Sequence, residues 1–191
     1  MSDLIDKSVL STSDLSDEEL AVRAVYDSKF FTFLVTRYKE KFFYYLKSFS
    51  GFQDDEAEDV IQVSFIKIYK NLNNFDRRLK FSSWAYRIVR NEAIDELRRS
   101  KRNQSTALDN LEIPDAISLT EEMDKKLAQE IVLKTLKDLK AEYREILVLR
   151  FFAHKEYKEI SDILQKPIGT VCTLIDRAKK QFKDKYQNYA G

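Results

Sequence analysis

Glycine and proline are scarce in this chain: its 191 residues include three glycines and two prolines. A β-rich fold needs many tight turns, and these two residues are the ones that most often supply them. Hydrophobic residues make up 43% of the chain, which is enough to build cores and argues against wholesale disorder. The sequence therefore predicts an all-α protein, and its length fits two small helical domains better than one.

Other residue counts exclude whole classes of function. One cysteine and one histidine cannot form an internal disulfide, a multi-cysteine zinc site or the usual nucleophile constellations. We therefore expect no enzyme activity, no metal and no cofactor. The N-terminus lacks a basic segment followed by an apolar one, and no stretch approaches ~20 uncharged apolar residues. We expect a cytoplasmic protein without membrane insertion.

The net charge of +1 hides a strong segregation of charge along the chain. Residues 77–102 hold nine bases and three acids, whereas residues 103–124 hold six acids and no base. Residues 177–185 hold five bases and one acid. Two basic blocks separated by an acidic stretch indicate two surfaces that face a polyanion.

Apolar residues spaced by three and four predict helices in the first half of the chain. Ser16 and Glu19 fit a capping box before a short helix. Residues 27–50 share one apolar face, and Gly51 is suited to end that helix in the left-handed conformation. The acids of residues 54–59 complement the dipole at the start of a second long helix.

The segment after this second helix is predicted to be a loop over residues 71–80, because Asn and Asp favour turns over helix interiors. Ser82 or Ser83 is then suited to cap a third helix that reaches about Arg99. The helical pattern lapses after residue 102 and resumes near Thr120. We predict an N-terminal domain (1–102), an acidic linker (103–124) and a C-terminal domain (125–191).

Residues 157–183 carry the strongest short signal. Two apolar helical faces are joined by a short turn, and Pro167 stands where the second helix is expected to begin. This is the plan of a helix-turn-helix, whose second helix enters a DNA groove. An ordinary helical hairpin with a solvated basic end has the same pattern.

Residues 75–90 interleave aromatic and basic side chains, including Phe75, Trp84 and Arg90. Bases stack on aromatic faces while Arg and Lys neutralise phosphates, so the pattern suits single-stranded nucleic acid. Equally, Trp84 can belong to the core beneath solvated arginines. Asn91, Asp95 and Arg98 follow on one helical face, either as a polar ladder or as a base-reading strip.

Three further features favour ordinary structural roles. The paired acids of residues 54–59 match no calcium loop, and a helix start with a partner-binding face explains them better. His154 fits a loop residue, and Cys172 fits a small residue on a helix without a second thiol to support redox chemistry.

Taken in order, these pieces resemble the bacterial sigma factors of the extracytoplasmic-function class over residues 16–183. The motifs are SDEEL, DDEAEDVIQVSFIKIYKNLNNF, FSSWAYRIVRNEAIDELRRSKR, LKDLKAEYREILVLRFF and the helix-turn-helix. The resemblance implies a subunit that directs core RNA polymerase to promoters and assists their melting. It also implies an anti-sigma factor as partner.

The resemblance assigns residues to three surfaces. The polymerase clamp would be bound by Asp59, Gln62 and Phe65. The melted −10 element, on its non-template strand, would be held by Asn74, Phe75, Arg77, Arg78, Lys80, Ser83, Trp84, Arg87, Asn91, Asp95 and Arg98. The duplex −35 element would be read by Thr170, Cys172, Thr173, Asp176, Arg177 and Lys180.

Two places depart from the family pattern. Val63 stands where a Glu is common, which weakens the polar part of the clamp contact. Cys172, Thr173 and Leu174 stand where basic residues are common, so −35 contact is expected to be weak or its sequence unusual. The alternatives from the residues alone are a stand-alone helix-turn-helix regulator and a helical adaptor that binds no DNA.

Overall fold

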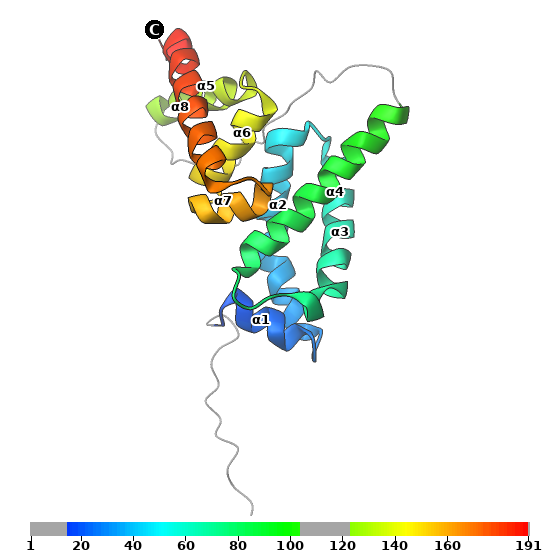
Figure 1. The fold of residues 1–191 in the computed structure, drawn as a ribbon. Coiled ribbons are helices and arrows are strands. Elements are labelled where there is room, and N and C mark those ends of the chain that lie inside the picture. The colour runs from blue at the N-terminus through cyan, green and yellow to red at the C-terminus, as the bar shows by residue number, and fades with distance from the viewer. Residues whose placement is uncertain (1–14, 104–122, 191) are drawn as a thin grey trace, which may run out of the picture.

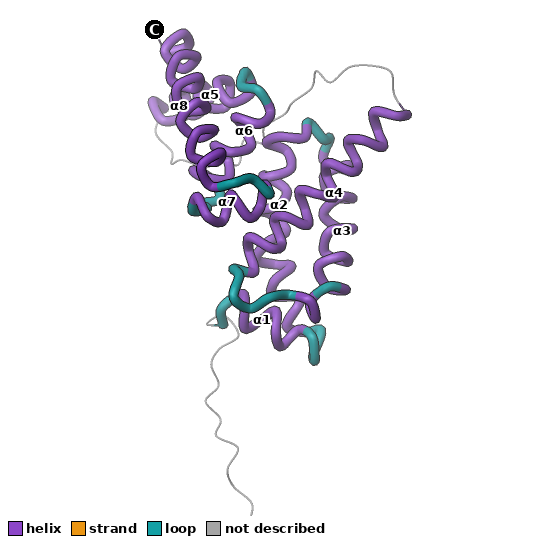
Figure 2. Tube along the Cα trace, in the orientation of Figure 1, coloured by secondary structure: helices purple, strands orange, loops and turns teal. Residues whose placement is uncertain are grey.

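Helices build the whole described structure. The computed structural model describes residues 15–103 and 123–190, and these form eight α-helices and no strand (Figures 1 and 2). The helices are α1 (Asp17–Ala24), α2 (Lys29–Ser50), α3 (Asp54–Lys70), α4 (Phe81–Asn103), α5 (Met123–Lys137), α6 (Ala141–Leu147), α7 (Tyr157–Leu164) and α8 (Ile168–Ala190). A 3₁₀ turn (Leu72–Asn74) follows α3, and a π-helical segment (Val148–Phe152) follows α6. The predicted all-α fold is confirmed.

Local sequence signals set several helix ends. The backbone N–H of Glu19 donates to Ser16 Oγ at 3.2 Å, and the backbone N–H of Ser16 donates to Glu19 Oε2 at 2.8 Å. This confirms the predicted capping box. Gly51 ends α2 with φ 77°, a left-handed conformation that glycine adopts without steric cost. Asp54, Asp55 and Glu56 form the acidic first turn of α3.

Two predicted helix starts are wrong by one to three residues. The helix α4 begins at Phe81, so Ser82 and Ser83 lie in its first turn and do not cap it. The backbone N–H of Phe81 instead donates to the Glu18 carboxylate of α1 at 2.8 Å. At α8, the carbonyl of Pro167 accepts the first helical hydrogen bond from Val171 at 3.1 Å, which places Pro167 before the helix rather than in it.

Aromatic rings form the centre of the N-terminal half. The rings of Tyr38 and Phe42 on α2 contact those of Phe81 and Tyr86 on α4, with centroids 5.0–5.7 Å apart. Phe42 also contacts Phe65 of α3 at 5.6 Å. The predicted apolar face of α2 is buried in these contacts, and α2, α3 and α4 pack as one unit.

The C-terminal half packs directly against this unit. The helix α7 lies across the first turns of α4, and α6 lies against α2 (Figure 1). Buried apolar side chains form a single connected cluster through both halves. The proposed linker falls mostly on residues 104–122, outside the described structure. None of the described helices is both long and apolar enough to cross a membrane.

Candidate nucleic-acid interface

The outer face of α3 carries the residues assigned to the polymerase clamp. Asp59 and Gln62 are exposed. Phe65 is half-buried and packs edge-on against Phe31 at 6.1 Å. Phe65 therefore anchors α3 to α2 as much as it faces outward.

Sequence analysis missed two neighbours on this face. Ile66 is 54% exposed and Tyr69 is 44% exposed, and with Val63 they form an apolar strip on the outer side of α3. Large apolar side chains that remain in contact with water at adjacent positions mark an interaction surface. Helical periodicity predicts α3 correctly. It does not show that no other part of the described structure buries this second face of the helix.

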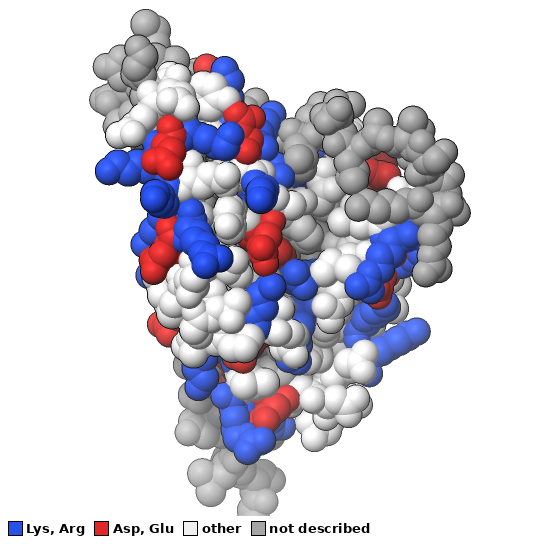
Figure 3. Space-filling model, turned by 45° about the horizontal axis from the view of Figure 1, so that its top comes forward, with Lys and Arg blue, Asp and Glu red and all other residues white. Residues whose placement is uncertain are grey.

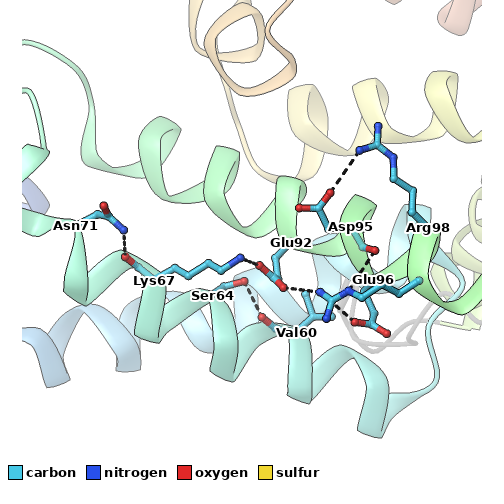
Figure 4. A network of polar contacts seen from close by, with 9 residues as sticks. Val60, Ser64, Lys67, Asn71, Glu92, Asp95, Glu96 and Arg98 are labelled. Carbon is cyan, nitrogen blue, oxygen red and sulfur yellow. Dashed lines mark hydrogen bonds and ion pairs between the residues drawn. The ribbon is translucent and has the colours of Figure 1, made fainter.

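A buried carboxylate joins α3 to α4 (Figure 4). Glu92 of α4 is 4% exposed and accepts hydrogen bonds from Lys67 of α3 and from Arg99, the latter at 2.9 Å. A buried charge with two cationic partners is satisfied, and removing either partner would weaken that compensation. Glu92 therefore fixes the spacing of the two helices.

The loop between α3 and α4 projects its basic side chains into water. Arg77, Arg78 and Lys80 are exposed. Arg78 donates to both carboxylate oxygens of Asp76, at 3.0–3.1 Å from Nε and 2.7 Å from Nη2. These hydrogen bonds lower the pKa of Asp76 to about 2. The Arg78–Asp76 ion pair thus stabilises the shape of the loop. Arg77 and Lys80 are exposed and can contact phosphates.

Aromatic residues support this loop from below. Phe75 and Trp84 are 9% and 8% exposed, and their ring centroids lie 5.3 Å apart. Both also contact Phe81, at 5.7 and 5.8 Å. In this structure Phe75 and Trp84 are core residues, which matches the structural alternative left open for Trp84.

A cavity of about 350 Å³ with both polar and apolar walls opens between α3, the loop and α4. It is lined by Lys67, Asn71, Asn74, Trp84, Ile88, Asn91, Glu92 and Asp95. Three amides offer both donors and acceptors, which is the chemistry needed to meet the edge of a base. Asp95 also pairs with Arg98 at 3.4 Å, so the Asn91–Asp95–Arg98 face serves both as a ladder and as a cavity wall.

The other residues predicted for the −10 element divide by exposure. Asn74, Arg77, Arg78, Lys80, Asn91, Asp95 and Arg98 are exposed, Arg87 is half-buried, and Phe75, Ser83 and Trp84 are buried. Ser83 donates to Glu159 of α7 at 3.3 Å. Four of the eleven residues of the set line the cavity, namely Asn74, Trp84, Asn91 and Asp95. Ser83 lies elsewhere, in the contact with the C-terminal half.

The helix pair α7–α8 has the predicted helix-turn-helix form. Ile160, Ile163, Val171 and Ile175 are fully buried on its inner side. Gln165 takes the left-handed conformation (φ 53°) that closes the turn. The half-buried Cys172 and the exposed residues listed next form the face predicted to meet the −35 element: Thr170, Thr173, Asp176, Arg177 and Lys180. Leu174 is 8% exposed and points into the core.

Basic side chains spread over both halves of the molecule with carboxylates among them (Figure 3). No trio of His, Cys, Asp or Glu in the described ranges is arranged to hold a metal ion. The N-terminal half offers hydrogen-bonding groups, charged groups and a cavity large enough for a base. The C-terminal half offers an exposed helix face on α8, and a helix fits the DNA major groove.

Comparison with known proteins identifies the two halves separately. Residues 34–103 match the family model Sigma-70 region 2, and residues 129–182 match Sigma-70, region 4. The N-terminal match covers most of α2 and all of α3, the loop and α4, and the C-terminal match covers the helix-turn-helix.

Whole-chain relatives agree. The ECF RNA polymerase sigma factor SigW of Bacillus subtilis is 33% identical over 83% of this chain and 91% of its own length. The ECF RNA polymerase sigma-E factor of Salmonella typhimurium is 30% identical over 92% of this chain and 97% of its own length.

Solved structures share the fold. The structure of CnrH in complex with the cytosolic domain of CnrY has a TM-score of 0.65 at 24% identity, covering 88% of this chain and 95% of that one. The sigma factor RpoE in complex with the anti-sigma factor NepR from Bartonella quintana has a TM-score of 0.60 at 21% identity, covering 80% and 98%. The chain belongs to the ECF family of RNA polymerase sigma factors.

Proposed function

We propose that this chain directs core RNA polymerase to promoters by gripping DNA at two places and transforms no substrate itself. The observation that carries this is the pairing, in one chain, of a base-sized cavity that has three asparagines in its wall with an exposed helix-turn-helix face. A stand-alone regulator needs the second surface and has no use for the first.

The cavity between α3 and α4 is the proposed holder of an unpaired base from the −10 element. Taking a base from the stack costs a few kcal/mol. Hydrogen bonds from Asn71, Asn74 and Asn91 can offset part of that cost once the base is inside. Arg77 and Lys80 on the loop are then placed to neutralise neighbouring phosphates. Phe75 and Trp84 hold the loop in position from the core.

The exposed face of α8 is the proposed reader of the −35 duplex. Thr170 and Thr173 in its first turns are short, polar side chains, so they read bases less sharply than arginine does. Arg177 and Lys180 lie one and two turns later, where phosphate contact is the natural role. We therefore expect strong backbone positioning and modest base discrimination.

The outer face of α3 is the proposed polymerase contact, through Asp59, Gln62 and the apolar strip at Val63, Ile66 and Tyr69. With Val63 in place of a carboxylate, apolar burial supplies more of this contact than charge. The acidic linker, residues 103–124, would avoid phosphates and follow a basic channel of the enzyme.

Partners and location follow from the same role. The RpoE structure contains an anti-sigma factor, and we propose that this chain is also held silent by a protein of that kind. Its place of action is the cytoplasm, where polymerase and promoters are found.

Run-off transcription tests the proposal. Purified core polymerase is mixed with the full chain and fragments of the host genome, and new start sites are mapped. Appearance of start sites that depend on the chain supports the proposal. A folded chain that neither stimulates transcription nor co-purifies with polymerase refutes it, and tight duplex binding without polymerase would then favour the stand-alone regulator.

A further inference from the structure

A cavity of about 380 Å³ lies between α2, α4 and the segment that joins α6 to α7. Tyrosine rings, apolar side chains, two lysines and a histidine form its wall, and no Asp or Glu of the described residues belongs to it. Its volume is in the range of sites that hold small molecules. We propose that this cavity binds a small organic anion, a flat apolar body that carries one carboxylate or phosphate group.

Two ammonium groups lie at the cavity wall, each beside an aromatic ring. Lys41 Nζ lies 5.3 Å from the ring centre of Tyr38, and Lys155 Nζ lies 5.1 Å from the ring centre of Tyr86. An ammonium group within about 6 Å of a ring centre is attracted to the face of the ring. Because all four residues line the cavity, these contacts hold two positive charges where an anion can pair with them.

The two lysines retain capacity to bind an anion. Lys41 forms no ion pair with an acidic side chain in the described part of the chain. Lys155 donates to Ser82 Oγ at 2.7 Å, and its ammonium lies 3.8 Å from a Glu159 oxygen. Burial is the main cause that lowers the pKa of Lys155, and the positive charge of Lys41 lowers it further. An anion between the two lysines offsets this repulsion.

Tyr86 supplies a hydroxyl without a partner. The residue is 2% exposed, and its hydroxyl forms no hydrogen bond with any described residue. The neighbouring buried tyrosines differ, since Tyr38 donates to Asp17. Tyr45 donates to Glu145 at 2.8 Å. Most buried hydroxyls are hydrogen-bonded, and Tyr86 lines the cavity. An anionic oxygen in the cavity is therefore a suitable acceptor for this hydroxyl.

Backbone contacts fix the wall that follows α6. The N–H of Lys155 donates to the carbonyl of Leu149 at 2.9 Å, and Arg150 Nη1 donates to the carbonyl of Lys155 at 3.1 Å. His154, which also lines the cavity, has φ 52°, a left-handed conformation that is uncommon for a residue other than glycine. Residues held in such conformations by their surroundings cluster at ligand sites. The wall is thus formed before a ligand arrives.

Binding at this cavity requires neither polymerase nor DNA, so it is measured on the full chain alone. Calorimetric titration uses two anions, 2-naphthoate and adenosine 5′-monophosphate, and their neutral analogues 2-naphthamide and adenosine. We expect saturable binding of at least one anion and at least about tenfold weaker binding of its neutral analogue. The tighter anion identifies the charged group as carboxylate or phosphate. Binding of neither anion in the millimolar range, or equal binding of a neutral analogue, overturns the proposal.

Substitutions then locate the bound anion. Lys41→Met changes an exposed side chain and Tyr86→Phe keeps its buried ring, so both variants are expected to fold. Each is expected to weaken binding at least about fivefold, because each removes one partner of a charged ligand. Lys39→Met removes the same charge from an exposed position of α2 outside the cavity and is expected to bind as the wild type does. Unchanged binding by both K41M and Y86F overturns the site.

A second cavity provides a further control. An apolar cavity of about 260 Å³ lies between α5, α6 and α8 and has Lys179 in its wall. Lys179→Met is expected to leave anion binding unchanged. Loss of binding in K179M with normal binding in K41M would place the anion in this second cavity and overturn the proposal. A bound ligand also stabilises the folded chain, so the anion is expected to raise the thermal midpoint of the wild type more than that of K41M. Equal rises contradict the proposal.

Discussion

Trp84 offers the sharpest test of how the −10 surface is built, because it is the only tryptophan in the chain. It is 8% exposed and packs against Phe75 and Phe81. If Trp84 is a core residue, Trp84→Ala leaves a large cavity beneath the loop. Replacing a buried Phe or Trp by Ala costs about 3–5 kcal/mol.

This cost translates into a thermal shift. For a chain of this size, 1 kcal/mol moves the unfolding midpoint by about 2–4 °C, so W84A is expected to lower it by about 6–20 °C. Trp84→Phe retains an aromatic ring against Phe75 and is expected to lower the midpoint less. Circular dichroism during a thermal ramp measures both.

Fluorescence and promoter opening then test whether Trp84 acts as a supporting core residue. The single tryptophan of the wild type is expected to emit as a buried indole. Open-complex formation by W84F, measured with core polymerase below its unfolding midpoint, is expected to remain near wild type. The reasoning is refuted if W84A shifts the midpoint by less than about 2 °C while abolishing promoter opening.

Three other predictions concern separate surfaces. Burial is the main cause that raises the pKa of Tyr38, Tyr45 and Tyr86. Their stabilising effect is therefore complete below the unfolded value near 10 and is lost as pH rises above it. Absorbance near 295 nm should show at least three of the ten tyrosines ionising only with unfolding, and smooth titration of all ten in folded protein would contradict this. Arg177→Ala should weaken −35 binding evenly across sequences and reduce the salt slope by about one, whereas a loss at one base position would mean base readout. Gln62→Ala should reduce co-purification with polymerase while changing stability by less than about 0.5 kcal/mol, and undiminished co-purification would remove Gln62 from the contact.

Local patterns predicted what depends on neighbours along the chain. Apolar periodicity identified the buried face of α2. The capping box at Ser16 and the cap at Gly51 were identified from residue type and short spacing. Each of these features depends on residues within one or two helical turns. The inner face of α8 followed in the same way, with Val171 and Ile175 buried as expected.

Contacts between residues far apart in the sequence could not be predicted from such local patterns. The cap of α4 comes from Glu18, 63 residues earlier in the chain than the Phe81 N–H that it accepts from. Arg90 and Glu145 are 55 residues apart, and no spacing rule connects them. The burial of Trp84 could not be decided either, since aromatic residues beside arginines have the same pattern in a core and on a DNA-binding surface.

Buried ion pairs join helices both within the N-terminal half and between the two halves. Glu92 joins α3 to α4 with a buried charge held by two cations, so a change in the shape of the −10 cavity would have to break that buried network. Between the halves, the Arg90–Glu145 pair lies beside an apolar cluster that runs through both. Separating the halves would therefore expose apolar surface as well as break this pair. A partner would have to bind a separated form more tightly than the joined one to favour it, because a ligand with equal affinity for two forms shifts nothing.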